Sequence, residues 1–200
     1  MKRLVAACAT LILVGTVCAI SAGWLLAHPI QTRIGNPPTD LNAQAVSFAS
    51  DSGATVHGWW CPVRNNRGAV LLLPGIRANR LSMVDRARFL RRAGYSVLLI
   101  DFQATGETRG DHITFGWKES HDVLSAIDFI GHIDPTIRVA IIGSSLGGVA
   151  ALLATPPPKV DTLVLEEVYP TIEIATRNRM ENYLCAFGAM VTPVLLNQLQ

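Results

Sequence analysis

The chain has 200 residues, half of them hydrophobic and 16% charged, which excludes a disordered or fibrous protein and suits one domain with a real core. The formal net charge is +2 and the basic residues are scattered, so the composition does not predict a nucleic-acid partner. Two cysteines lie in the N-terminal apolar run, and the wide separation of Cys61 and Cys185 neither requires a disulfide nor suggests a metal site.

Residues 1–30 are predicted to be an N-terminal membrane anchor or signal segment. Lys2 and Arg3 precede 24 uncharged residues, from Leu4 to Ala27, whereas a helix needs roughly 20 to cross a bilayer. Ala19-Ile20-Ser21 could also serve as a signal-peptide cleavage site. An anchor would leave the domain on the extracytoplasmic side of a membrane, and cleavage would leave it secreted or periplasmic.

Residues 31–42 are predicted to be a linker because they are rich in Gly, Pro, Asn and Asp, and the domain is expected over residues 43–200. Residues 45–49 and 55–60 predict a hairpin around an Asp-Ser-Gly turn. Residues 68–73 form a continuous apolar run, which is typical of a strand that is buried on both faces.

Helices and strands alternate after the hairpin. Helical spacing is found over residues 81–90 and 123–130, and residues 172–200 also have a helical pattern. Further strands are predicted over residues 96–100, 137–142 and 160–165. This alternation predicts an α/β fold, with a mostly parallel sheet covered by helices on both faces.

A Gly-x-Ser-x-Gly turn lies between the strand ending at Ile142 and the helical pattern from Val149 onward. In this strand–turn–helix context a serine becomes an exposed nucleophile, so Ser145 is the predicted nucleophile. The backbone N–H of Leu146 would help to hold an oxyanion. The alternative is an ordinary loop between a strand and a helix.

A second oxyanion donor is expected in the loop after residues 68–73. Pro74 and Gly75 leave that strand, and the N–H of Ile76 is the predicted donor. The alternative is a Pro-Gly turn with no role in catalysis.

On these residues the chain resembles the α/β-hydrolase superfamily, and within it the serine aminopeptidase and monoacylglycerol lipase group. The resemblance runs from about residue 43 to about residue 169. It rests on residues 72–75, 93–102, 106–108, 114–123 and 143–148. The chain departs from the family at Pro74, where a His is usual, and at Gln103 to Gly106, where many relatives have Arg-Gly-His-Gly.

The resemblance implies two more strands after residues 160–165, whose loops carry the triad Asp and His, so we expect this chain to lack the C-terminal part of the fold. No histidine follows Ser145. His112 and His121 are candidate bases because they follow strand 96–100 on the carboxyl side of the sheet. Glu166 or Glu167 could supply the acid, or be ordinary carboxylates at a strand end. His57 and His132 are expected to be structural or solvated.

The resemblance implies a serine hydrolase of esterase, lipase or peptidase type, which acts on an ester, thioester or amide carbonyl through an acyl-enzyme. The substrate would be a small or lipid-like acyl compound, and no cofactor or metal is implied. One alternative is a catalytically incompetent protein, either truncated or binding-only, because the base is not evident. Another is an acyltransferase. The oligomeric state is not indicated.

Overall fold

The computed structural model of this protein describes residues 2–169, 171, 174 and 177. The chain forms two compact units, one of residues 28–168 and one of residues 1–27 with 169–200. In the smaller unit, helix α1 spans Lys2–Ala27. Among the described residues we find no helix that is long and apolar enough to cross a membrane. The helical pattern predicted over residues 172–200 lies almost wholly outside the described residues.

The larger unit is built on a six-stranded sheet with the strand order β2-β3-β5-β4-β7-β8. The strands are β2 (Gln44–Ala49), β3 (Thr55–Cys61), β4 (Ala69–Leu73), β5 (Ser96–Ile100), β7 (Val139–Ser144) and β8 (Thr162–Glu166). The β2–β3 hairpin and the β3–β5 pair are antiparallel, whereas β5, β4, β7 and β8 run parallel to one another. The predicted mostly parallel sheet is therefore confirmed.

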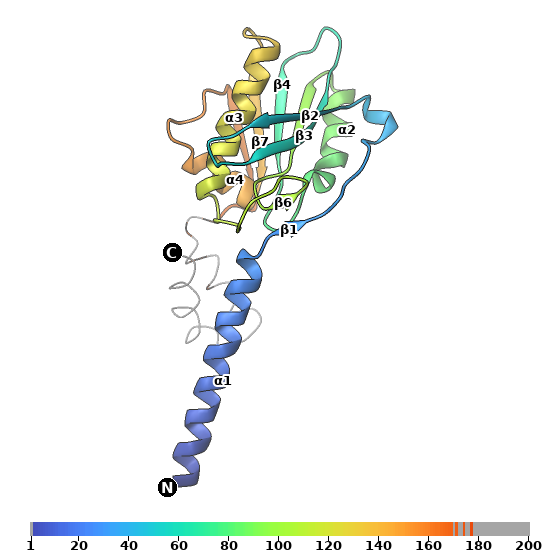
Figure 1. Cartoon of the computed structure of the whole chain (residues 1–200). Coiled ribbons are helices and arrows are strands. Elements are labelled where there is room, and N and C mark those ends of the chain that lie inside the picture. Colours follow the sequence, from blue (N-terminus) through green and yellow to red (C-terminus); the bar gives the residue numbers. More distant parts are fainter. Residues whose placement is uncertain (1, 170, 172–173, 175–176, 178–200) are drawn as a thin grey trace. The chain divides into compact units, whose positions relative to one another are not determined.

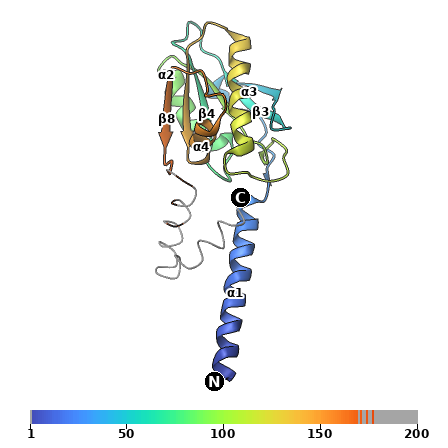
Figure 2. The ribbon, with the colours of Figure 1, turned by 90° about the vertical axis from the view of Figure 1, so that its left-hand side faces the viewer.

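Helices cover both faces of this sheet, as Figures 1 and 2 show. The helices are α2 (Val84–Arg92), α3 (Trp117–Ile133) and α4 (Leu146–Leu153). Leu71 and Leu73 of β4 belong to the core beneath α3 and α4, whereas Val70 and Leu72 belong to the core beneath α2. Every residue of β4 is buried, which explains why the sequence of this strand is continuously apolar rather than alternating.

Two helices differ from their predicted extents for local reasons. The first begins as a 3₁₀ turn, η2 (Arg80–Met83), where the Asn79 side chain accepts the N–H of Leu81. The second begins at Trp117 because the Glu119 carboxylate accepts the backbone N–H of Gly116, just before the first turn. A carboxylate in this position satisfies a donor that the helix leaves unpaired.

Residues 31–42, which were predicted to be a linker, are instead part of the larger unit. Strand β1 (Ile30–Gln31) pairs in parallel with β6 (Thr105–Gly106), and the Glu107 carboxylate accepts the N–H groups of Ile34 and Gly35. Leu41, in the short 3₁₀ turn η1 (Thr39–Leu41), is only 1% exposed. The compact unit therefore starts at His28, not at residue 43. Residues 31–42 have a composition typical of loops, but these backbone hydrogen bonds and the burial of Leu41 hold them within the unit.

Candidate functional site

Ser145 lies in a sharp turn between the end of β7 and the start of α4. Its backbone adopts φ 49° and ψ −110°, a region that residues other than glycine rarely occupy. The N–H of Ser145 donates to the carbonyl oxygen of Glu166 at 2.8 Å, and its own carbonyl accepts from the N–H groups of Gly148 and Val149. These contacts hold the serine in its strained conformation at the carboxyl edge of the sheet.

The glycines on either side of this serine allow the strand and the helix to pack closely. A Cβ atom on Gly143 would lie 2.6 Å from the backbone nitrogen of Gly148. A Cβ atom on Gly147 would lie 2.5 Å from the carbonyl oxygen of Leu73, at the end of β4. Real Cβ atoms do not approach other heavy atoms so closely, so both positions require glycine if the turn is to keep this geometry.

The loop after β4 runs beside the serine. A Cβ atom added to Gly75 would lie 3.8 Å from the Cβ atom of Ser145, so the two loops run close to each other. Within the part of the chain that the structure describes, the N–H groups of Ile76 and Leu146 find no hydrogen-bond acceptor. Leu146 is the first residue of α4, where backbone N–H groups lack an intrahelical partner and favour negative charge. Both predicted oxyanion donors are thus without an acceptor in the described structure. Each lies in the chain just after the carboxyl end of a strand, β4 for Ile76 and β7 for Leu146.

In the described part of the chain, no histidine forms a hydrogen bond with Ser145. Among the described residues, the Ser145 hydroxyl has no hydrogen-bond partner. His112 is exposed, and His121 lies in α3 with a partly buried side chain. The ring of His132 contacts the carbonyl oxygen of Asp128 at 2.7 Å, in keeping with a structural or solvated role. The general base therefore stays unidentified in this part of the chain.

The carboxylates of Glu166 and Glu167 also form no hydrogen bond with the serine hydroxyl in the described structure. The Glu166 carboxylate forms an ion pair with the guanidinium of Arg86 on α2, while only its backbone carbonyl contacts the serine turn. Glu167 is exposed and adopts a left-handed φ of 55°. Neither carboxylate orients a histidine in the described structure.

A buried charged cluster beside this edge was not foreseen from the sequence. Arg80 donates to the Asp101 carboxylate at 2.6 Å and also binds Glu107. Burial raises the pKa of Asp101, and the Arg80 cation opposes that rise. Against the effect of burial, hydrogen bonds from Arg80 and from two backbone N–H groups together lower the pKa of Glu107. The signal in the sequence was Asp101 itself, an acidic residue at the end of a wholly apolar strand.

A second buried carboxylate, Asp122, lies on the core-facing side of α3. It accepts hydrogen bonds from the hydroxyls of Ser50 and Ser52, each at 2.6 Å, and from the backbone N–H of Gln103 at 2.7 Å. Burial nevertheless raises the pKa of Asp122 to about 6. Its place on the same helical face as Val123 and Ala126 was the signal that could have revealed it.

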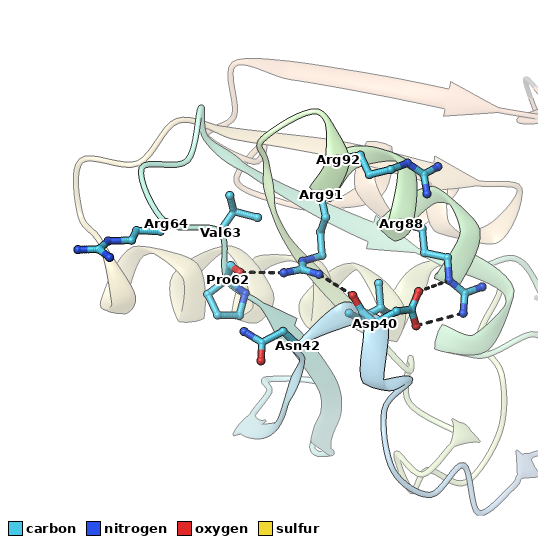
Figure 3. Close-up of a pocket in the computed structure, with 9 residues that line it drawn as sticks. Asp40, Asn42, Pro62, Val63, Arg64, Arg88, Arg91 and Arg92 are labelled. Atoms are coloured by element: carbon cyan, nitrogen blue, oxygen red, sulfur yellow. Dashed lines mark hydrogen bonds and ion pairs between the residues drawn. The ribbon is translucent and has the colours of Figure 1, made fainter.

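An arginine-rich groove of about 530 Å³ lies at the other edge of the sheet (Figure 3). There the Arg88 side chain donates to the Asp40 carboxylate at 2.7 Å, and Arg91 donates to the carbonyl oxygens of Asp40 and Pro62. Cys61, next to Pro62, pairs with the first part of β5, so this groove is near the amino ends of the parallel strands. Arg88 and Arg91 are thus engaged in contacts with neighbouring segments, and Figure 3 shows Arg64 pointing away from them.

Within the described residues, no group of three His, Cys, Asp or Glu side chains could hold a metal ion.

Residues 70–196 match the alpha/beta hydrolase family. The chain belongs to this family. The match includes the loop of Ile76, the buried cluster around Asp101 and the turn of Ser145.

Curated relatives match this α/β hydrolase over part of its length. An uncharacterized protein, YfhR of Salmonella typhimurium, is 27% identical over 125 residues, which are 58% of this chain and 42% of that protein. The polyketide transferase ATR5 of Stachybotrys chlorohalonatus is 28% identical over 120 residues, which are 57% of this chain and 40% of that protein. The chain thus spans about two fifths of the length of these relatives.

Solved structures agree on the fold. The esterase Pf2001 of Pyrococcus furiosus matches with a TM-score of 0.69 and 23% identity, over 88% of this chain and 69% of that one. XC6422 of Xanthomonas campestris, described as an α/β serine hydrolase without a lid, matches with a TM-score of 0.54 and 19% identity, over 65% of this chain and 63% of that one. At these identities the likeness establishes the α/β-hydrolase fold alone.

Proposed function

We propose that this protein is a serine hydrolase of esterase type, in which Ser145 attacks the carbonyl carbon of an ester, thioester or amide. The observation that carries the proposal is the conformation of Ser145 itself. A non-glycine residue held at φ 49° between a strand and a helix stores strain that the fold must offset, and such strain is concentrated at functional sites. The turn supports a nucleophile more directly than the sequence motif does.

The proposed chemistry has two parts that this chain supplies. The Ser145 oxygen forms the new bond to the carbonyl carbon, and the carbonyl oxygen takes the negative charge. The free N–H groups of Ile76 and Leu146 would donate to that oxygen, and each such donor is worth about 10²–10³ in rate. The serine proton passes to a base. The bond from the carbonyl carbon to the alcohol, thiol or amine of the substrate then breaks, and the base gives the proton to that leaving group. Water later attacks the acyl-enzyme and releases the acid. The base is the part of the site that has no residue assigned.

Covalent labelling of the full chain with a fluorophosphonate probe tests this proposal. Labelling of wild type at Ser145, absent in Ser145→Ala and retained in the neighbouring Ser144→Ala, is the expected result. A folded, monodisperse wild type that takes up no label at Ser145 would instead support the binding-only alternative. Ser144→Ala is a matched control because Ser144 is the last residue of β7 and its side chain is also partly exposed.

Acyl transfer is a second candidate, because one relative is named a polyketide transferase. A transferase would use the same serine but direct the acyl group to an alcohol or amine instead of water. Product analysis with a simple aryl ester in the presence of increasing alcohol separates the two. A hydrolase yields mainly the free acid, whereas a transferase yields mainly the new ester at alcohol concentrations far below that of water.

We also propose that the protein is exported. The support is the pair of cations Lys2 and Arg3 followed by 24 uncharged residues, Leu4 to Ala27. A fusion of residues 1–30 to a reporter enzyme that is active only outside the bacterial cytoplasm tests this. Activity that is lost when Leu11, Leu13 and Leu25 are replaced by Arg is expected, and an inactive but intact fusion would refute export.

A further inference from the structure

Arg80, at the start of the short turn η2, is a buried cation that contacts two carboxylates and an aromatic ring. Its side chain is 2% exposed and its guanidinium lies 4.8 Å from the ring centre of Trp59. Nη1 donates to the Asp101 carboxylate at 2.6 Å, and the backbone N–H of Arg80 donates to the other oxygen of the same carboxylate at 2.8 Å. Nη2 binds the Glu107 carboxylate. Arg80 is thus fixed in both its backbone and its side chain.

These contacts fix one end of the loop that carries Ile76. The loop leaves β4 at Pro74 and reaches Arg80 at the start of η2. Between them the N–H of Ala78 donates to the carbonyl of Gly75 at 3.2 Å, and Arg77 adopts a left-handed φ of 58°. The β4 end is held by the sheet, so the other anchor of the loop is Arg80 on Asp101.

The same loop runs close to Ser145 at Gly75, where an added Cβ atom would lie 3.8 Å from the Cβ atom of the serine. A shift of the Arg80 anchor would therefore move Ile76 relative to the serine oxygen. Small displacements matter here, because misplacement by about 1 Å can cost on the order of 10²-fold in rate. Stabilising the fold does not by itself explain why a charged residue is buried at position 80. Apolar residues of similar volume can often replace a buried ion pair without loss of stability.

We propose that Arg80 is a positioning residue of the oxyanion site. By binding Asp101 and Glu107 it holds the loop of residues 75–79 so that the Ile76 N–H stays beside Ser145. Glu107 extends the linkage to residues 34 and 35, whose N–H groups it also accepts. This inference rests on the proposed function, in which Ile76 and Ser145 share one reacting carbonyl group.

The test compares Arg80→Met and Arg80→Lys with the matched control Arg88→Met in the full chain. Arg88 also pairs with carboxylates, those of Asp40 and Asp85, but at the distant groove. The fluorophosphonate reaction is resolved into its maximal inactivation rate and its half-saturating probe concentration. Arg80→Met is expected to lower the rate by about 10- to 100-fold with the half-saturating concentration within about twofold. Arg80→Lys should fall between, and Arg88→Met should match wild type.

Amide hydrogen exchange of Ala78, whose N–H donates to the carbonyl oxygen of Gly75, gives a second readout that needs no catalysis. We expect faster exchange in Arg80→Met than in Arg88→Met, and this result would support the positioning role. It would do so even if wild type took up no label, because missing label refutes only the proposed function. Unchanged exchange and unchanged labelling in a folded Arg80→Met would overturn the inference. If Arg80→Met does not fold, the labelling rate and the amide exchange are measured in Arg80→Lys and Glu107→Gln instead. Wild-type values of both quantities in both variants would overturn the inference.

Discussion

The backbone N–H of Ser145 donates to the carbonyl oxygen of Glu166, and this 2.8 Å bond joins the serine turn to the neighbouring strand β8. The bond belongs to the backbone, so it persists whatever side chain occupies position 145. It helps to keep that residue at φ 49°, where an L-amino acid with a Cβ atom is strained. The strain is therefore stored in the fold and can be measured by substitution.

Ser145→Gly is expected to raise the free energy of unfolding by about 1 kcal/mol, because glycine adopts positive φ without the steric cost. The matched substitution Ser144→Gly, one residue earlier in β7, is expected to lower it by about 0.5–1 kcal/mol, since regular strand geometry gives glycine no advantage. Urea unfolding of both variants measures the contrast. A Ser145→Gly variant that is less stable than wild type would show that the turn is not strained.

Gly147→Ala is expected to destabilise the fold by about 2 kcal/mol or more and to abolish labelling of Ser145. The added Cβ would lie 2.5 Å from the carbonyl oxygen of Leu73 and 2.7 Å from its Cβ atom, so α4 would have to move away from β4. The control is Gly131→Ala in α3, where no atom lies within 4 Å of the added methyl group. There alanine should stabilise the helix by up to about 1 kcal/mol. Equal effects at both positions would contradict the packing argument.

The sequence predicted those parts of the site that depend on neighbouring residues. The apolar run of β4 and the glycines around Ser145 are local patterns, and they sufficed for the sheet, the serine turn and its glycine spacing. The roles of Ser145, Ile76 and Leu146 stay predictions until labelling is measured.

Pairs of residues distant in the chain were not foreseen. Arg80 lies 21 positions from Asp101, and Glu107 lies 72 positions from Gly35. Neither pair leaves a periodic pattern in the sequence, because its members contact each other only after the strands have assembled. The same reason explains why residues 31–42 resembled a linker: their partners, β6 and Glu107, come about 70 residues later.

Glu166→Gln is expected to leave the labelling rate of Ser145 within about twofold of wild type. The carboxylate of Glu166 is bound by Arg86, and its contact with the serine turn is made by the backbone carbonyl, which glutamine retains. Because both side chains are partly exposed, losing the ion pair should cost less than about 1 kcal/mol in unfolding free energy. A large loss of labelling without loss of stability would instead identify Glu166 as the acid of the site.

Asp122 should make the stability of the fold depend on pH. Burial raises its pKa from 3.8 to about 6, so between these values the folded chain binds this proton more strongly than the unfolded chain does. Stability from this group is therefore highest below about pH 4, falls as the pH rises towards 6 and is constant above. A shift of this size corresponds to about 3 kcal/mol, an order-of-magnitude figure.

The Asp122→Asn variant isolates this contribution, because asparagine does not titrate. Urea unfolding at pH 4, 5, 6 and 7 gives the stability of wild type minus that of the variant at each pH. That difference is expected to become less favourable to wild type between pH 4 and pH 6 and then to level off. A difference that instead grew in favour of wild type over this range would mean that the three hydrogen bonds to Asp122 outweigh its burial and lower its pKa.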